Sequence, residues 1–563
     1  MRYVGLGKTL FNSSLSTISD GAGSPAVEVF LSERFDRVKN SGQSPVSLPV
    51  RLRAGEEDVE IAESSDVVEG LAKERILNQG FPFFEYLRAK GLTPLSREFN
   101  PQIRLVGHHH AHAAAAVLRS PFRKALVFVM DGAGSSVETL AAIGAESELL
   151  ANVKPEEFEH ASAYLFDEGK LSPVSKEFMR FSGKAGEGFG TSPGIFYETI
   201  AKFIFGKQTD PGKVMGLAPF GKGEVIHDLL RFQEELDWGK SFKGKTKAEW
   251  EAHPSSELFR NLAASAQMTF EDHYLSRIQK LREKFPGYDN LILAGGCALN
   301  CTANWKLQAG KTFREIYVAC NPGDESIGLG CAAVLWLRDH ADDWRPLPWH
   351  KQNSFLGPLS SVPRAPALEE LFAGFHVVEC PAVEAEAAQA IARQEIIAWF
   401  QGRSECGPRA LGHRSILAGP LRRDLKAQLN AHIKFRESFR PYGCAVLWED
   451  ADTYFQIPRG FQNPFMSFAV PVRDEYVDLL SQVSHVDGTS RMQTLQREQD
   501  ELFYRLLEKV RELTGHGLVL NTSLNVMNEP ILETAEDALR FFRSSEVDAL
   551  FIGNLMIRKK RHV

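Results

Sequence analysis

Short apolar runs alternate with stretches of helical periodicity along the first 350 residues. Four runs, at residues 103–106, 125–130, 290–294 and 315–318, are short and apolar enough to predict buried strands. An Ala-rich stretch that predicts a helix begins directly after the first run. Strands that alternate with helices in this way predict a layered α/β domain.

A second region of the same kind follows residue 370. Strands are predicted at residues 375–378, 396–400, 445–448, 468–472 and 517–520, and helices at residues 383–393, 421–435, 497–513 and from Thr534 onward. Between the two regions, residues 345–366 hold five prolines and no periodic apolar pattern, which indicates an interdomain linker. We therefore expect one α/β domain at residues 1–350, a linker at 351–370 and a second α/β domain at 371–563.

The composition is that of a large globular enzyme. At 563 residues the chain is too long for one ordinary core, which favours two domains. It is 43% hydrophobic, and its formal charge of −7 argues against a surface dedicated to nucleic acid. Seven cysteines without paired C-x-x-C spacing indicate neither a disulfide framework nor a zinc ribbon. No segment has the pattern of a secretion signal or a membrane span, so we expect a cytoplasmic protein without a membrane partner.

Four histidines stand among the five residues 108–112, at the start of the Ala-rich helix. His108 and His112 lie four positions apart, so both imidazoles leave the same helix face and can converge on one metal ion. Asp131 and Asp324 each follow a predicted strand, and ligands collect beyond the carboxyl ends of strands in open α/β sheets. These four residues are candidate metal ligands, and their nitrogen and oxygen donors suit iron, manganese or zinc. The alternative is a helix start that binds no metal.

Glycines follow the predicted strands as well. Gly295 and Gly296 come directly after residues 290–294, where backbone N–H groups can approach a phosphate closely, although such a pair is more often a plain tight turn. Together with Asp131-Gly132 and Asp324, this loop resembles the acidic and glycine-rich loops of the actin-like ATPase superfold. The candidate nucleotide-binding residues are Gly132, Gly295, Gly296, Asn300 and Asp324.

Two cation-rich blocks lie in the second domain. Residues 403–415 read RSECGPRALGHRS and residues 434–442 read KFRESFRPY. Their cations are packed among Gly, Pro and aromatic residues instead of being spread along a solvated helix face. Because guanidinium groups capture phosphate or carboxylate with two parallel hydrogen bonds, these blocks predict an anion pocket. The alternative is a set of ordinary surface charges.

These motifs, in this order, resemble the NodU/CmcH-type carbamoyltransferase family. The resemblance extends over nearly the whole chain, and the motifs that carry it are residues 32–39, 108–112, 131–132, 213–219, 295–300, 323–324, 407–415, 434–442, 487–493 and 521–525. It implies an N-terminal actin-like ATPase (ASKHA) domain and a C-terminal YrdC-like domain. Both are α/β folds, as the periodicity predicts.

The resemblance also implies a two-step reaction. Carbamoyl phosphate and ATP would form carbamoyl adenylate, which then passes its carbamoyl group to a hydroxyl of a small natural-product acceptor. By resemblance, the divalent metal at His108, His112, Asp131 and Asp324 is iron(II), and Mg²⁺ accompanies ATP. The residues that would hold carbamoyl phosphate are Arg409, Lys434, Arg440, Arg491, Ser523 and Asn525.

The chain departs from the family pattern near its start. Family members have a His-Asp-Ala-Ser sequence where this chain has Phe11-Asn12-Ser13-Ser14, so a histidine that would assist the acceptor is missing. We expect Asp210 to act as general base instead, with Lys213 and His108 as the other catalytic candidates. Cys406 replaces an expected aromatic residue and Asn528 an expected glycine, and both changes look tolerable.

Two rival functions stay open. One is a tRNA-modifying enzyme with threonylcarbamoyl chemistry on the same two folds, although the acidic balance weighs against a nucleic-acid partner. The other is a paralogue that binds nucleotide and metal but has lost turnover. Residues 142–190 and 235–256 are candidates for the acceptor pocket, but they do not identify the acceptor. The oligomeric state, a homodimer included, is equally open.

Overall fold

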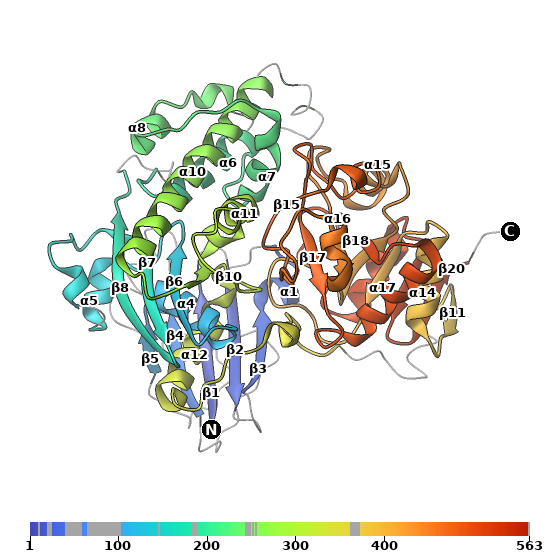
Figure 1. The fold of residues 1–563 in the computed structure, drawn as a ribbon, viewed down its shortest axis with the longest axis horizontal. Coiled ribbons are helices and arrows are strands. Elements are labelled where there is room, and N and C mark those ends of the chain that lie inside the picture. Colours follow the sequence, from blue (N-terminus) through green and yellow to red (C-terminus); the bar gives the residue numbers. More distant parts are fainter. Residues whose placement is uncertain are drawn as a thin grey trace. The chain divides into compact units, whose positions relative to one another are not determined.

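The computed structural model describes residues 1–9, 12–19, 25–39, 59–64, 103–144, 147–182, 189–241, 249, 253, 256–360 and 372–560. The chain divides into two compact units, shown in Figure 1. Unit 1 contains residues 1–36 and 40–347, and unit 2 contains residues 37–39 and 348–563. The two units are therefore not separated at a single position in the sequence. Residues Arg37–Lys39 belong to unit 2 although they lie near the N-terminus.

Unit 1 holds a five-stranded sheet in the order β3-β2-β1-β4-β5. The central strand β1 pairs antiparallel with β2 and parallel with β4. Outside them, β3 pairs antiparallel with β2, and β5 pairs parallel with β4. The strands are β1 (Arg2–Lys8), β2 (Ser13–Ser19), β3 (Ala26–Leu31), β4 (Val59–Ser64) and β5 (Ile103–Val106).

A second sheet of unit 1 repeats this plan in the order β8-β7-β6-β9-β10. Its central strand β6 pairs antiparallel with β7 and parallel with β9, and the outer strands repeat the same pattern. The strands are β6 (Lys124–Met130), β7 (Phe158–Asp167), β8 (Lys170–Met179), β9 (Asn290–Ala294) and β10 (Glu315–Val318). Two copies of one sheet topology in tandem are the architecture of the actin-like fold, as expected.

Two helices that cross at close range connect the sheets. Helix α4 (His108–Leu118) packs on β6, β7 and β9, while α12 (Ile327–His340) packs on β1, β2 and β4 and against α4. A side chain at Gly330 would place its Cβ 1.9 Å from the carbonyl oxygen of Ala111, so only glycine permits this crossing. The small side chains of the Ala-rich helix α4 also permit this close crossing. The crossing brings the start of α4 near the loop before α12.

Several other helices of unit 1 gather around α10, the longest helix of its described part. Helix α10 packs against α6, α7 and α11, and α6 also packs against α8 (Figure 1). The helices are α1 (Ser32–Asp36), α5 (Val137–Ala142), α6 (Pro193–Phe205), α7 (Pro211–Leu217), α8 (Leu229–Glu234), α10 (Ser256–Lys284) and α11 (Cys301–Ala309).

Unit 2 is built on an eight-stranded mixed sheet in the order β11-β20-β19-β12-β13-β18-β14-β17. Only β12 with β19 and β14 with β17 pair in parallel. The strands are β11 (Phe375–Glu379), β12 (Ile397–Phe400), β13 (Arg414–Ala418), β14 (Gly443–Leu447), β17 (Met492–Leu495), β18 (Leu518–Ser523), β19 (Ala549–Ile552) and β20 (Leu555–Lys559). The predicted α/β class is confirmed, and a mixed sheet agrees with the YrdC-like fold.

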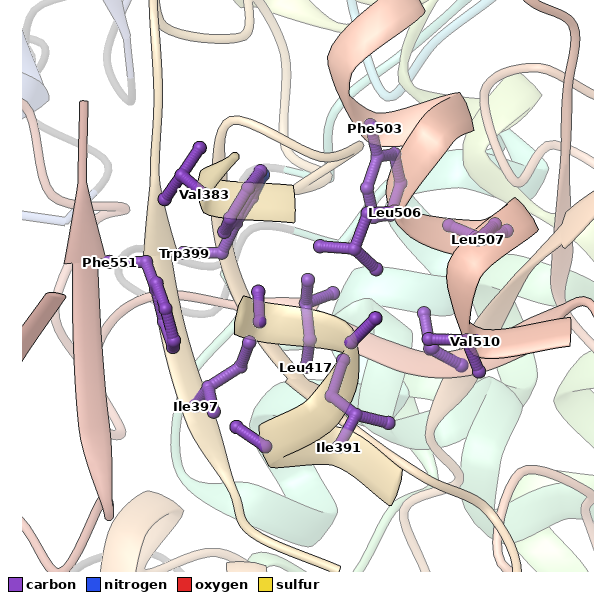
Figure 2. Close-up of a cluster of buried hydrophobic side chains, with 14 of the residues drawn as sticks. Val383, Ile391, Ile397, Trp399, Leu417, Phe503, Leu506, Leu507, Val510 and Phe551 are labelled. Atoms are coloured by element: carbon purple, nitrogen blue, oxygen red, sulfur yellow. The ribbon is translucent and has the colours of Figure 1, made fainter. Parts of the chain in front are cut away.

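Two helices cover one face of this sheet. Figure 2 shows Trp399 of β12 and Phe551 of β19 in one buried cluster with side chains of α14 (Val383–Ala392) and α17 (Glu501–Thr514). The side chains of Trp399, Phe551 and Phe503 are fully buried there. A third helix, α18 (Ala535–Ser544), begins after Thr534 as predicted, and Thr534 and Asp537 form a capping box in which each side chain accepts from the other residue's backbone N–H group.

Other predicted elements of unit 2 differ from the structure. The helix predicted at residues 421–435 is α15 (Leu425–Gln428) followed by a π-helical segment (Leu429–Lys434), which ends at Phe435 with a φ of 49°. The strand predicted at residues 468–472 is reduced to the two residues of β15 (Val470–Pro471). Strands β13, β17, β19 and β20 of the eight-stranded sheet were not predicted, because their short runs carry no distinct periodic pattern.

The segment expected to be a linker is partly built into unit 2. Residues 351–360 belong to that unit, and residues 361–371 lie outside the described part of the chain. The amide of Cys406 donates to the carbonyl oxygen of Ser354 over 2.6 Å, and the ring of Phe355 stacks on His413 at 3.5 Å. These contacts order a proline-rich segment that has no regular periodicity of its own. Within the described residues, no helix is long and apolar enough to cross a membrane.

Candidate functional site

Four predicted side chains converge in unit 1. One donor atom from each of His108, His112, Asp131 and Asp324 lies within 4.8 Å of the other three. The two imidazole Nε2 atoms are 3.1 Å apart, and each lies 3.1 to 3.7 Å from a carboxylate oxygen of both aspartates. The histidines come from the first two turns of α4, Asp131 follows β6, and Asp324 follows β10. The strand ends predicted from the sequence do meet at one place.

This spacing fits a single divalent ion. Donor atoms that surround a metal tetrahedrally at roughly 2.1 Å are about 3.4 Å from one another, within the observed range of contacts. Two imidazole nitrogens and two carboxylate oxygens match the donor preference of iron, manganese or zinc. The ligand set therefore fits a metal by both chemistry and geometry, without choosing the element.

Charge is balanced within the cluster. Burial alone lowers the pKa of His108, but hydrogen bonds with Asp131 and Asp324 outweigh it and raise this pKa well above 6.5. The same balance raises the pKa of His112 and lowers the pKa of both aspartates below 3.8. Because metal ligation needs the unprotonated imidazoles, a metal that bound at this site would displace protons.

Neighbouring groups fix the orientation of the ligands. The Ser326 hydroxyl donates to the carbonyl oxygen of Gly323 over 2.9 Å, and its oxygen lies 3.1 Å from Nδ1 of His112. An Nδ1–H that donates to Ser326 leaves the Nε2 lone pair of His112 directed at the aspartates. The Asp131 carboxylate accepts from the amides of Gly132 and Gly296 over 2.7 and 3.1 Å.

The start of α4 is capped from another strand. Gly107 provides no side-chain cap, and the Glu159 carboxylate of β7 accepts from the amide of His109 over 3.1 Å and from that of Ser135 over 3.2 Å. Lys176 forms an ion pair with Glu159. A buried carboxylate thereby satisfies helix donors that would otherwise lack a partner.

The other two histidines of the tract are structural. Nδ1 of His109 lies 2.8 Å from the hydroxyl of Ser162, and burial followed by the charge of Lys176 lowers the pKa of His109 well below 6.5. Burial and the same lysine lower the pKa of His110 to about 4. Both imidazoles are therefore neutral, and neither belongs to the four-residue cluster.

The glycines predicted to bind nucleotide have defined structural roles. Gly295 has a φ of 82°, and a Cβ there would lie 2.3 Å from the carbonyl oxygen of Met130, so glycine is required at the turn. Asn300 caps α11 by accepting from the amide of Ala303 over 3.1 Å, and its amide donates to Gln267 over 3.0 Å. Gly296 and Gly132 orient Asp131. Nucleotide binding by these residues stays a prediction.

Glu198 is a neighbour of this site that sequence reasoning missed. Its helix α6 begins with Ser192, which accepts from the amide of Ile195, and ends at Gly206 in the left-handed conformation. The Glu198 carboxyl oxygen lies 3.4 Å from the position of a Cβ on Gly132. Burial, followed by the charges of Asp131 and Asp324, raises the pKa of Glu198 to about 8. Its pKa depends on burial and on Asp131 and Asp324, which are remote from it in the sequence.

The residues predicted to handle the acceptor are less fully placed. Asp210 precedes α7, and its carboxylate forms an ion pair with Lys213 at 2.9 Å. Asn12 closes the turn between β1 and β2, where its carbonyl oxygen accepts from the amide of Thr9 over 2.7 Å. Phe11 lies outside the described residues, as do residues 145–146 and 183–188 and most of residues 242–255 in the stretches expected near the acceptor. The catalytic roles of Asp210 and Lys213 stay predictions.

Unit 2 brings several of the predicted anion-binding residues together around Lys434. The buried Lys434 ammonium donates to the carbonyl and side-chain oxygens of Ser523 and Asn525 at 2.6 to 3.2 Å. Burial, followed by the positive charges of Arg436 and Arg440, lowers the pKa of Lys434 well below 10.5. Cations held this close together are stabilised when an anion binds among them.

Arg436 belongs to the same group of cations although it was not singled out as a site residue. Its Nε donates to Asn430 over 3.2 Å, and its guanidinium lies 3.8 Å from the ring centre of Tyr442. Burial is the largest cause that lowers the pKa of Arg436 to about 10. The contact with Tyr442 opposes this shift, and the positive charges of Arg440 and Arg491 add to it. The π-helical segment before Lys434, which the periodicity did not reveal, turns these side chains inward.

Arg409 lies in a loop of unit 2 that a buried carboxylate organises. One oxygen of Glu405 accepts from the amides of Leu411, His413 and Arg414 over 2.8 to 3.1 Å. This arrangement explains why the first cation-rich block, residues 403–415, combines glycines with arginines: the loop must fold back on Glu405. Cys406, the departure noted there, is buried and free, as are five of the other six cysteines, Cys297 being half-buried.

Comparisons with known proteins match both halves of the chain. The Carbamoyltransferase N-terminus family matches residues 59–333, and the Carbamoyltransferase C-terminus family matches residues 388–559. Nodulation protein NolNO of Sinorhizobium fredii is 32% identical over an alignment 572 residues long. The alignment covers 96% of this chain and 78% of that protein. The 3'-hydroxymethylcephem-O-carbamoyltransferase of Streptomyces clavuligerus is 28% identical over 378 residues, or 66% of this chain and 68% of that enzyme.

Among solved structures, HypF of T. kodakarensis is similar with a TM-score of 0.37 and 13% identity, over 61% of this chain and 49% of that chain. The match to both family halves and the extent of the NolNO alignment agree with the motif order read from the sequence. The chain therefore belongs to the carbamoyltransferase family and is a transferase enzyme.

Proposed function

We propose that this enzyme is an ATP-dependent O-carbamoyltransferase that works through carbamoyl adenylate. In the first step, water and carbamoyl phosphate give carbamate and phosphate, and a carbamate oxygen then attacks the α-phosphorus of ATP, which releases pyrophosphate. In the second step, an acceptor hydroxyl attacks the carbamoyl carbon, AMP leaves, and the hydroxyl proton goes to a base. The products are a carbamate ester, AMP, pyrophosphate and phosphate.

The observation that carries this proposal is the presence of two differently built sites in one chain. Transfer straight from carbamoyl phosphate needs an anion site alone, such as the buried cations around Lys434. The duplicated sheet of unit 1 adds a second site at its strand ends, where His108, His112, Asp131 and Asp324 meet beside the Gly295 turn. A second site of this composition is what a nucleotide with its metal requires.

In unit 2, the cations would bind the carbamoyl phosphate dianion. Arg440, Arg491 and Arg409 supply guanidinium groups that can each make paired hydrogen bonds to phosphate oxygens. Lys434, held by Ser523 and Asn525, would present a fixed ammonium to the bridging or carbonyl oxygen of the substrate. Fixed donors of this kind stabilise charge that develops when the carbamoyl–phosphate bond breaks.

In unit 1, the four clustered ligands would hold a divalent metal, for which the family resemblance favours iron(II), and Mg²⁺ would accompany ATP. When bound, the metal neutralises negative charge on the nucleotide phosphate. Asp210, whose carboxylate forms an ion pair with Lys213, is the proposed base for the acceptor hydroxyl. The Gly295 turn would let the backbone approach the nucleotide.

The proposed acceptor is a small natural product that carries a free hydroxyl. One relative is named for the carbamoylation of a hydroxymethyl group on a cephem, and another is a nodulation protein. We propose tailoring of an antibiotic or a comparable metabolite in the cytoplasm, without a nucleic-acid or membrane partner.

The proposal is tested by incubating the enzyme with carbamoyl phosphate, labelled ATP and a library of hydroxylated metabolites. Mass spectrometry should find an acceptor heavier by one carbamoyl group, and pyrophosphate should be released only when carbamoyl phosphate is present. Nuclease treatment of the preparation should leave this activity unchanged. Pyrophosphate release that requires added tRNA would instead support the threonylcarbamoyl alternative.

A further inference from the structure

Arg37 binds a loop of unit 2 from the N-terminal part of the chain. Helix α1 ends at Asp36 in unit 1, and the next three residues, Arg37–Lys39, belong to unit 2. These residues form the end of a family-like motif at positions 32–39 to which the two-step reaction assigns no role. Arg37 has a φ of 62°, a left-handed conformation that is unfavourable for arginine and persists only where surrounding contacts fix it.

The Arg37 guanidinium holds two consecutive main-chain carbonyl groups. Nη1 donates to the carbonyl oxygen of Ile531 over 2.9 Å, and Nη2 donates to that of Pro530 over 3.2 Å. Two carboxylates flank the guanidinium, Glu529 at 3.8 Å and Asp537 at 3.9 Å. A planar guanidinium reaches two neighbouring oxygens at once, which a lysine ammonium cannot do with the same rigidity.

The loop that Arg37 holds leads directly to the proposed carbamoyl phosphate site. Its two ends are joined by the amide of Leu532, which donates to the carbonyl oxygen of Leu524 over 3.1 Å. Inside the loop, the Asn525 side-chain amide donates to the carbonyl oxygen of Glu529 over 2.7 Å. The same Asn525 side chain accepts from the Lys434 ammonium through Oδ1 over 2.6 Å.

The loop depends on external support. Pro530 has no amide hydrogen to donate, and Asn528 occupies a left-handed turn with a φ of 68°. Asparagine tolerates this conformation better than other residues with side chains, which explains why it can replace the glycine expected there. Lys39 lies close enough that its positive charge contributes to the lowered pKa of Lys434. The segment at 37–39 therefore reaches the neighbourhood of the site at two points.

We propose that Arg37 is a positioning residue for the carbamoyl phosphate site. By holding the carbonyl groups of Pro530 and Ile531, it fixes the loop at 524–532 and thereby the Asn525 side chain that directs the Lys434 ammonium. This inference rests on the proposed function of the site in unit 2. On this proposal, the motif at 32–39 supports the carbamoyl phosphate site, whose other residues lie more than 350 positions later in the chain.

The role of Arg37 is tested in the full-length protein with carbamoyl phosphate as the titrated ligand. Arg37→Ala should weaken its binding about tenfold, as expected for one lost charge-assisted hydrogen bond. KM for carbamoyl phosphate should rise while kcat at saturation stays near the wild-type value. Arg37→Lys keeps the charge but not the paired geometry, so it should recover part of the affinity. Hydrogen exchange should increase at the amides of residues 524–532 in Arg37→Ala.

The matched control is Arg473→Ala, which removes another arginine that donates to a carbonyl of unit 2, that of Asp452 over 2.9 Å. This control should bind carbamoyl phosphate as the wild type does. Equal affinity and equal exchange in Arg37→Ala and the wild type would overturn the positioning role alone. A wild-type protein that does not bind carbamoyl phosphate would instead contradict the proposed function of unit 2.

Discussion

His112 and Ser326 are joined by a 3.1 Å contact between Nδ1 and Oγ although 214 positions separate them in the sequence. The contact selects the tautomer in which Nε2 of His112 is free to bind a metal. Ser326→Ala should therefore lower metal affinity about 10- to 100-fold, the range typical of groups that orient a metal ligand. Metal titration monitored by calorimetry measures this, with Ser120→Ala as control, because Ser120 is a buried serine that accepts from the amide of Phe122. Unchanged affinity in Ser326→Ala would remove the orienting role.

Arg440 tests the anion site. Arg440→Ala removes one guanidinium from the cation group around Lys434, and a hydrogen bond to a charged group contributes roughly 1.5 to 3 kcal/mol. Use of carbamoyl phosphate should be lost, while nucleotide binding by unit 1 should persist. Steady-state kinetics and nucleotide titration on the same preparation separate the two effects. A normal KM for carbamoyl phosphate would place Arg440 outside the site.

Asp210 tests the proposed base. Asp210→Asn keeps the size of the side chain but removes the carboxylate that would accept the proton of the acceptor hydroxyl. Carbamoyl transfer should slow about a hundredfold or more, whereas pyrophosphate release should be unaffected. Rapid-quench assays of the two steps give both rates. Equal transfer rates in variant and wild type would assign proton removal to another group.

A buried ion pair makes the stability of unit 2 depend on pH. Nε2 of His413 lies 3.2 Å from Asp500, and this carboxylate overcomes the effect of burial and raises the pKa of His413 above 6.5. A raised pKa in the folded state stabilises the protein fully below the unfolded-state pKa of about 6.5, and this stabilisation is lost as pH rises through the folded-state pKa.

Asp500→Asn isolates that charge. Asp500 also caps α17 by accepting from the amide of Phe503, and asparagine caps a helix equally well. The melting temperature of the wild type should therefore fall more steeply than that of the variant as pH rises above about 6.5. Thermal unfolding followed at several pH values gives both curves. Parallel curves would mean that the pair does not contribute to stability.

Spacing within one helix was enough to predict half of the four-residue cluster. His108 and His112 share a helix face, and Asp131 and Asp324 follow strands whose ends meet, so local pattern and sheet topology placed all four. Ser326 was not predicted, because its partner belongs to a different helix and only the close crossing of α4 with α12 at Gly330 brings the two together.

Other features depend on packing that one sequence does not display. The duplicated sheet of unit 1 keeps strand order and direction without a repeat that can be read in the residues. In unit 2, the amphipathic pattern predicted an ordinary helix up to residue 435, whereas a π-helical segment ends at Lys434 and buries its ammonium among the oxygens of Ser523 and Asn525. The free-energy cost of burying the Lys434 ammonium depends on hydrogen-bond partners about 90 positions away in the sequence.

The ATP requirement of carbamoyl transfer tests the central claim most directly. The wild-type enzyme, its acceptor and carbamoyl phosphate are incubated with and without ATP, and the carbamate ester, AMP, ADP and pyrophosphate are quantified. The two-site account predicts one AMP and one pyrophosphate for each ester formed, and no ester without ATP. Ester formed equally well without ATP, or accompanied by ADP in place of AMP, would contradict the adenylate route and leave unit 1 without its proposed role.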